Sequence, residues 1–120
     1  MPRNDPRITR TILALGLVTA MASSWAHEPV AKCYLLDASS VRCRGASNDG
    51  DEMPGSRMEV LTLDGSALLE GTLDAKSTWT FKTPAQPFYV LFETGPGLQV
   101  TVEQDEITAP PKGRFPRWMR

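Results

Sequence analysis

From residue 27 onwards, apolar and polar residues alternate in short runs and do not recur every three or four positions. No window of about 11 residues carries the sustained apolar stripe of an amphipathic helix. The clearest strand is the segment 78–82, in which Trp79 and Phe81 share one face while the threonines and the lysine share the other. The run 87–93 is apolar on both faces, which predicts a central strand.

About seven such segments occur between residues 27 and 106, separated by turn residues. Asp64-Gly65 between two apolar runs is a strong hairpin signal, and a second turn is expected at Gly95-Pro-Gly97. Strands are expected over 30–36, 40–44, 58–63, 67–72, 78–82, 87–93 and 98–103. This spacing predicts an all-β fold, a small antiparallel β-sandwich of about seven strands, with a small barrel as the alternative.

The N-terminal segment has the three-part layout of a secretory signal peptide. Arg3, Arg7 and Arg10 precede an uncharged run over 11–26 that ends in Ser-Trp-Ala, with small residues at the −3 and −1 positions of a cut after Ala26. The run is shorter than the roughly 20 residues of a spanning helix, so a cleaved signal helix over 1–26 is favoured over a retained anchor. We therefore expect a periplasmic or secreted protein with no transmembrane helix after cleavage.

Composition and charge exclude several classes of function. Hydrophobic residues make up 41% of the 120 residues and charged residues 22%, which is typical of a globular chain. The net charge of −1 gives no case for nucleic-acid binding by the whole chain. One histidine and two cysteines exclude a zinc finger and any site with two histidine ligands. The only histidine, at a chain end, and the lack of a glycine-rich phosphate loop argue against an enzyme.

The two cysteines predict a disulfide. Cys33 and Cys43 are separated by an even number of positions, so a three-residue loop over 37–39 places them directly opposite each other in an antiparallel hairpin. Their Cα atoms would then be about 4.5–5.5 Å apart, close enough to bridge in an oxidising compartment. The alternative is a thiolate pair for metal or redox work, although the spacing is not that of a Cys-x-x-Cys motif.

After cleavage, His27 becomes the first residue, and it is the only histidine of the chain. A free α-amine and an imidazole Nδ1 on one residue can chelate one metal ion, because both groups can be unprotonated near neutral pH. Nickel, cobalt and copper favour such nitrogen ligands. Further ligands would come from a partner or from Glu28, Asp49, Asp51, Glu52, Met53 or Met58. The alternative is that His27 merely follows the cleavage site.

The charge is uneven along the chain. Residues 27–106 hold six basic and 13 acidic residues, whereas residues 107–120 hold four basic residues and no acid. We expect this basic tail to be disordered. The alternative is that it contacts an anionic membrane surface or a partner protein. The tail residues that would make this contact are Lys112, Arg114, Phe115, Arg117, Trp118 and Arg120.

The body resembles the carboxypeptidase-regulatory-like, or transthyretin-like, sandwich domains. The resemblance runs over roughly 55–102 and rests on 59–74 with its Asp-Gly turn, on Trp79-Thr-Phe81 and on 88–92. The chain departs from that pattern at 76–78, where Lys-Ser-Thr replaces the usual glycine, and at Asp74, one place later than usual. A narrower resemblance is to exported accessory proteins of nickel and cobalt uptake, which also begin the mature chain with histidine.

These observations predict an exported, non-catalytic β-sandwich protein with three parts: a signal peptide over 1–26, a sandwich over 27–106 and a tail over 107–120. The resemblance to uptake accessories implies handling of nickel or cobalt through His27, with copper as a further option and a membrane metal transporter as the partner. The alternative function is a metal-free protein-interaction or docking module of the cell envelope.

Overall fold

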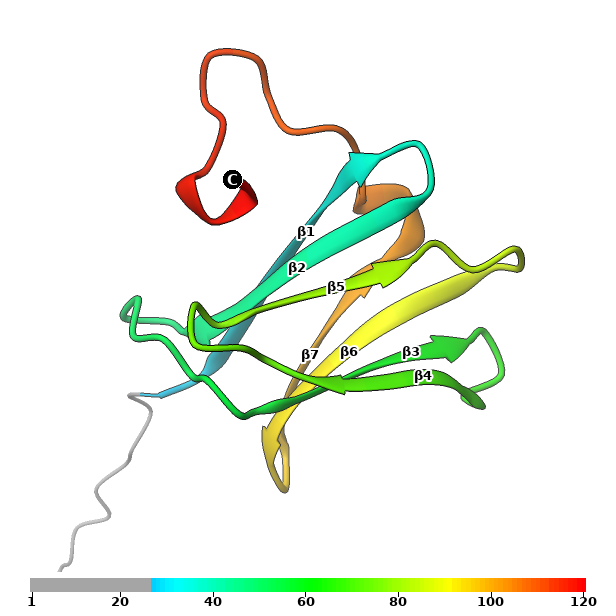
Figure 1. Ribbon diagram of the computed structural model, residues 1–120. Helices are drawn as coiled ribbons and strands as arrows, with labels where there is room; N and C mark the ends of the chain where they lie inside the picture. The colour runs from blue at the N-terminus through cyan, green and yellow to red at the C-terminus, as the bar shows by residue number, and fades with distance from the viewer. Residues whose placement is uncertain (1–26) are drawn as a thin grey trace, which may run out of the picture.

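The computed structural model describes residues 27–120, and the expected signal helix over 1–26 lies outside the described residues. Two antiparallel sheets pack face to face, as Figure 1 shows. The seven strands are β1 (Pro29–Asp37), β2 (Ser40–Ser47), β3 (Arg57–Thr62), β4 (Ala67–Thr72), β5 (Thr78–Lys82), β6 (Phe88–Gly95) and β7 (Leu98–Glu103). The predicted all-β sandwich is confirmed. Each predicted strand is present: β4, β5 and β7 have the predicted bounds, and the ends of the other four are shifted by one to three residues.

The strand order follows from short hairpins and three crossings between the sheets. One sheet has the order β1-β2-β5, and the other has the order β4-β3-β6-β7. The Asp64-Gly65 signal forms the β3–β4 turn, where Gly65 has a φ of 91° that favours glycine. The chain changes sheets over 48–56, 73–77 and 83–87. Among residues 27–120, no helix is long and apolar enough to cross a membrane.

The core lies between the two sheets and contains the inward residues of nearly every strand. Alternation explains this arrangement, because every second side chain of a strand points to the same face. The fully buried residues include Val41 of β2, Met58 and Val60 of β3, and Val90 and Phe92 of β6. Burying these apolar side chains is the main favourable term for so small a domain.

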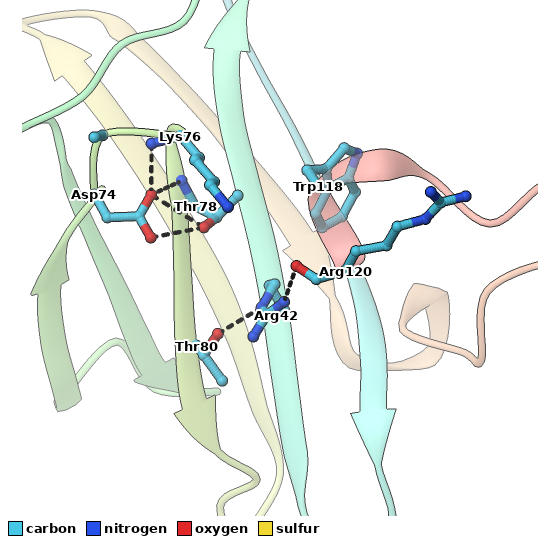
Figure 2. A pocket seen from close by; sticks show the side chains of 8 residues that line it. Arg42, Asp74, Lys76, Thr78, Thr80, Trp118 and Arg120 are labelled. Carbon is cyan, nitrogen blue, oxygen red and sulfur yellow. Dashed lines mark hydrogen bonds between the residues drawn. The ribbon is translucent and has the colours of Figure 1, made fainter.

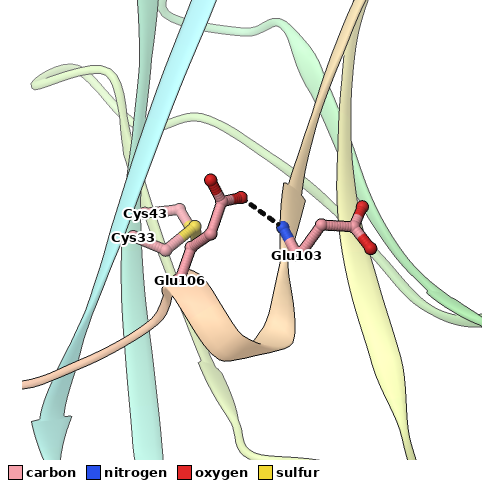
Figure 3. Close-up of a disulfide and its surroundings, with 4 residues drawn as sticks. All are labelled: Cys33, Cys43, Glu103 and Glu106. Carbon is pink, nitrogen blue, oxygen red and sulfur yellow. Dashed lines mark hydrogen bonds between the residues drawn. A yellow bond between two sulfur atoms is a disulfide. The ribbon is translucent and has the colours of Figure 1, made fainter.

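The predicted disulfide is present at the centre of the first sheet. Cys33 and Cys43 are directly paired across β1 and β2, with their Cα atoms 4.0 Å apart, and both are fully buried (Figure 3). Neither sulfur is free, so the alternative of a thiolate pair does not apply to this state of the chain. Because the bridge points inward, the flanking residues of both strands point outward.

Two glycines let aromatic rings fill the space between the sheets. A Cβ on Gly45 of β2 would lie 2.6 Å from the ring of Phe92 on β6. A Cβ on Gly71 of β4 would lie 2.2 Å from the Trp79 ring on β5. In both pairs, therefore, the ring of one sheet occupies the place where a side chain of the other sheet would start.

The structure differs from the expectation of a disordered tail beginning at residue 107. Ile107 is buried in the core, and the carbonyl of Thr108 accepts a hydrogen bond of 2.9 Å from the Leu35 amide. The chain then passes beyond the β1–β2 hairpin, and its end returns to the first sheet as the short 3-10 helix η2 (Arg117–Met119), with Met119 buried (Figure 1). These apolar tail residues find partners on β1 and β2 that no local sequence pattern reveals.

Candidate functional site

The structure places His27 beside one acidic residue, Asp49. The two atoms that approach are His27 Nδ1 and Asp49 Oδ2, which are 4.0 Å apart. Both side chains are open to solvent, with exposed fractions of 73% and 51%. Asn48 donates a backbone hydrogen bond of 2.8 Å to the carbonyl of Glu28, which holds the segment just before β1 against the 48–52 loop.

The loop presents Asp49 in a defined orientation. Its Oδ1 accepts hydrogen bonds from the Ser47 hydroxyl and from the Asp51 amide, while its Oδ2 faces His27. Gly50 permits the turn, because its φ of 94° favours glycine. These contacts lower the pKa of Asp49 below its ordinary value, with the Ser47 hydroxyl as the largest cause and the Asp51 amide next. Asp49 is therefore a carboxylate with one oxygen occupied and the other available.

A buried serine fixes the other end of the loop. The Ser77 hydroxyl donates to the Gly45 carbonyl at 2.6 Å and accepts from the Met53 amide at 2.7 Å. Ser77 has a φ of 65°, in the left-handed region that favours glycine. Its two hydrogen bonds compensate for the strained backbone.

The His27–Asp49 pair supplies part of a metal site. Nitrogen and oxygen ligands lie about 2.0–2.2 Å from a first-row metal, so two ligands on one ion are at most about 4.4 Å apart. The observed 4.0 Å therefore needs only small side-chain movement to bracket an ion. A free α-amine on His27 would be a third donor. Within residues 27–120, no group of three or more His, Cys, Asp or Glu side chains is assembled.

The other residues expected as metal ligands do not approach His27 as Asp49 does. Met58 is fully buried in the core, which rules it out as a ligand beside His27, and Met53 packs half-buried against the core. Glu28, Asp51 and Glu52 are exposed near the loop. Of the expected ligands, Asp49 is the one whose side chain approaches His27.

The tail residues proposed as contacts fall into two groups. Trp118 stacks on Tyr34 of β1, with ring centroids 5.6 Å apart, so its ring is largely occupied within the chain. Arg42 of β2 holds the same segment by donating to the Met119 carbonyl at 2.9 Å. The side chains of the remaining tail residues are exposed, and these are Lys112, Arg114, Phe115, Arg117 and Arg120.

A pocket of about 270 Å³ lies between this segment and the β4–β5 turn (Figure 2). Arg42, Lys76 and Arg120 contribute its basic side chains, and Asp74 is its one acidic residue. The Asp74 carboxylate accepts hydrogen bonds from the amides of Lys76 and Thr78, and these contacts, led by the Thr78 amide, lower its pKa. The Asp74 carboxylate therefore stabilises the β4–β5 turn.

Sequence reasoning missed the basic residues on the strands themselves. The inward Cys33 and Cys43 place Lys32, Arg42 and Arg44 on the outer face of the first sheet. The parity of 78–82 likewise places Lys82 outward. The alternation of side chains around the two cysteines was the sequence signal that could have identified these outward basic residues.

Fold and site together define a small disulfide-bridged β-sandwich with a histidine just before its first strand and a carboxylate of the 48–52 loop beside it. Comparison with known proteins finds no protein-family model, no curated protein and no solved structure that matches this chain. The resemblance to carboxypeptidase-regulatory-like domains therefore stays a prediction.

Proposed function

We propose that this protein is an exported, non-catalytic metal-handling protein that binds Ni²⁺, Co²⁺ or Cu²⁺ at its mature N-terminus. The observation that carries the proposal is the approach of Asp49 Oδ2 to His27 Nδ1. In this proposal the α-amine and Nδ1 of His27 chelate the ion, and Asp49 adds an oxygen ligand. Such nitrogen-rich ligand sets suit these late first-row metals.

The geometry supports a site that exchanges its metal. Both side chains are more than half exposed, so an ion there would keep open positions for water or for a ligand from another protein. This suits delivery to a partner, for which a membrane metal transporter is the proposed recipient. The disulfide is consistent with an oxidising compartment, and we propose the periplasm or the extracellular space.

The test is calorimetric titration of each metal into protein that has been exported and processed, with His27 established as residue one by mass spectrometry. We expect dissociation constants in the micromolar range or tighter. His27→Ala, or one extra residue before His27, should remove this binding, because each destroys the amine–imidazole chelate. Binding no tighter than millimolar, or binding unchanged in His27→Ala, would contradict the proposal.

A matched pair of variants tests the oxygen ligand. Asp49→Asn should weaken binding by about 10- to 100-fold, because it removes the charged oxygen that faces Nδ1. Asp51→Asn removes the same charge from the same loop, but the Asp51 side chain forms no ion pair with His27, so binding should change little. Equal weakening by the two variants would indicate a general charge effect and remove Asp49 from the site.

A second candidate function is a metal-free docking module of the cell envelope. The observation that favours it is the concentration of basic side chains on the outer face of the β1-β2-β5 sheet. Wild-type protein that binds no metal but retains this surface would leave the second function as the better one.

A further inference from the structure

Basic residues occupy several outward positions of the first sheet, in adjacent rows. Lys32 of β1 lies directly opposite Arg44 of β2, and Tyr34 lies opposite Arg42 in the next row. On β5 the outward residues are Thr78, Thr80 and Lys82. We call this set, with Lys76 and Arg120 at its margin, the basic face. None of the outward strand residues named here carries a carboxylate.

Direct pairing of Lys32 with Arg44 works against the fold, because like charges opposite each other in a sheet repel. Neither residue forms an ion pair with a carboxylate of the described chain within 4.0 Å. Within residues 27–120, Lys32 Nζ lies 5.3 Å from the centroid of the Tyr34 ring, a favourable contact for one of the two cations. An arrangement that costs stability in the isolated fold is expected where a binding function needs it.

The two sheets differ sharply in charge. Thirteen Lys and Arg residues occur in the chain, and three of them precede residue 27. Of the other ten, only Arg57 lies in the second sheet, where it pairs with Glu59 at 3.2 Å and with Glu70. The remaining nine lie on the first sheet, in the β4–β5 turn or in the tail. Residues 27–120 therefore carry a net negative charge, but their basic residues gather on the first sheet, the β4–β5 turn and the tail.

The tail carries two aromatic residues among its basic residues. Trp118 is half-buried on Tyr34, and it also lines a small hollow beside Lys32 and Arg44. Phe115 is 48% exposed and stands between Arg114 and Arg117 in the sequence. Aromatic residues interspersed with Arg and Lys are typical of surfaces that lie at the interface of a lipid bilayer.

We propose that the basic face and the exposed part of the tail dock on a bilayer rich in anionic phospholipids. Anionic headgroups would neutralise Lys32 and Arg44, and Phe115 would enter the headgroup region. A bilayer fits this surface better than an acidic protein does, because mobile headgroups can match charges spread over a sheet and a tail without a shaped counterpart. The proposal goes beyond metal handling and does not depend on it.

The experiment measures binding of processed protein to vesicles of phosphatidylcholine with 30% phosphatidylglycerol, and to vesicles of phosphatidylcholine alone. Removal of residues 1–26 is verified by mass, because the uncharged run over 11–26 would itself insert into lipid. We expect binding to the anionic vesicles at low salt, loss of binding near 0.5 M NaCl where screening is strong, and no binding to neutral vesicles. Net negative charge alone would repel the protein, so binding reports its basic side, that is, the basic face and the tail together.

Two substitutions of equal charge change make the test specific. Arg44→Gln should weaken binding about fivefold, because each basic residue near an anionic surface contributes about that factor. Arg57→Gln on the opposite sheet should change binding by less than twofold. Phe115→Ala should weaken binding while leaving the salt dependence unchanged, since it removes an apolar contact and no charge. Thermal unfolding confirms that each variant is folded.

Three results would overturn the proposal. They are absence of binding to anionic vesicles at low salt, equal weakening by Arg44→Gln and Arg57→Gln, and binding to a polyglutamate chain without binding to vesicles. The last result would assign the basic face to an acidic protein. Metal titration of the same protein is a separate readout, so failure of lipid docking and failure of metal binding are distinguishable.

Discussion

The packing of Gly45 against Phe92 makes a stringent test of how the two sheets meet. Gly45 lies in β2 of the first sheet and Phe92 in β6 of the second. In Gly45→Ala, the added Cβ would lie 2.6–2.8 Å from three carbon atoms of the ring, whereas ordinary carbon contacts are about 3.5–4.0 Å. The two groups must therefore separate by about 1 Å. Phe92 is fully buried, so its ring has no solvent side into which it can turn.

The expected cost is a balance of two terms. Overpacking a well-filled core costs about 1–3 kcal/mol, and the rigid surroundings of Phe92 place this site toward the upper end. Replacing glycine in a strand recovers about 0.5–1 kcal/mol of backbone entropy. We expect a net loss of about 1.5–2 kcal/mol in the free energy of unfolding. For a domain of this size, that loss corresponds to a fall in Tm of about 6–16 °C.

Thermal and urea unfolding measure the loss, and a double-mutant cycle assigns it. Phe92→Leu provides space near Gly45, so Gly45→Ala should cost at least 1 kcal/mol less in that background. Gly95→Ala is the control, because its Cβ would lie 3.7 Å from Leu98, an ordinary contact. An unchanged Tm in Gly45→Ala, or an equal loss with Leu at 92, would refute the packing described for the two sheets.

Four further predictions follow from individual contacts. Replacing Cys33 and Cys43 together by alanine should cost about 3 kcal/mol in urea unfolding, from loss of an 11-residue loop closure, or more if the buried pair leaves a cavity. Ser77→Ala should cost about 2 kcal/mol, because the buried Gly45 carbonyl and the partly buried Met53 amide both lose this hydrogen-bond partner. Because the pKa of Asp74 is lowered in the folded state, the ionised carboxylate stabilises the fold at pH values above the ordinary aspartate pKa near 3.9. This stability is lost as the pH falls through the lowered pKa. The fall in Tm between about pH 5 and about pH 2 should therefore be smaller in Asp74→Asn than in the wild type. Trp118→Ala should release the tail end, seen as faster amide exchange of 115–120 with the strands still protected.

Local signals in the sequence were sufficient to predict most of the fold. Period-two alternation located the strands, and Asp64-Gly65 located one hairpin. The even spacing of Cys33 and Cys43 predicted their direct pairing, which the structure confirms. These predictions succeeded because each depends on residues close together in the chain, where parity and turn chemistry decide the outcome.

The tail and the N-terminal site depend on residues far apart in the sequence, and local reasoning does not reach them. Trp118 finds Tyr34 across more than eighty residues, and Arg42 binds the carbonyl of Met119. Composition alone made the tail look disordered, because it has no periodicity and two prolines at its start. Asp49 was one of several possible partners of His27, and only the path of the 48–52 loop singles it out.

The position of the basic face follows from the cysteine pairing that the sequence predicted, although local sequence reasoning did not identify the face itself. Once Cys33 and Cys43 are known to point inward together, alternation requires Lys32 and Arg44 to point outward together, so the bridge that stabilises the hairpin also sets two cations side by side. A one-residue slip of register would break the bridge, and it would also direct these cations into the core. The disulfide therefore fixes the position of the charges on the face, and we expect reduction of the bridge to weaken lipid binding as well as stability. Reduced protein that binds anionic vesicles as tightly as oxidised protein would show that the tail alone carries the interaction.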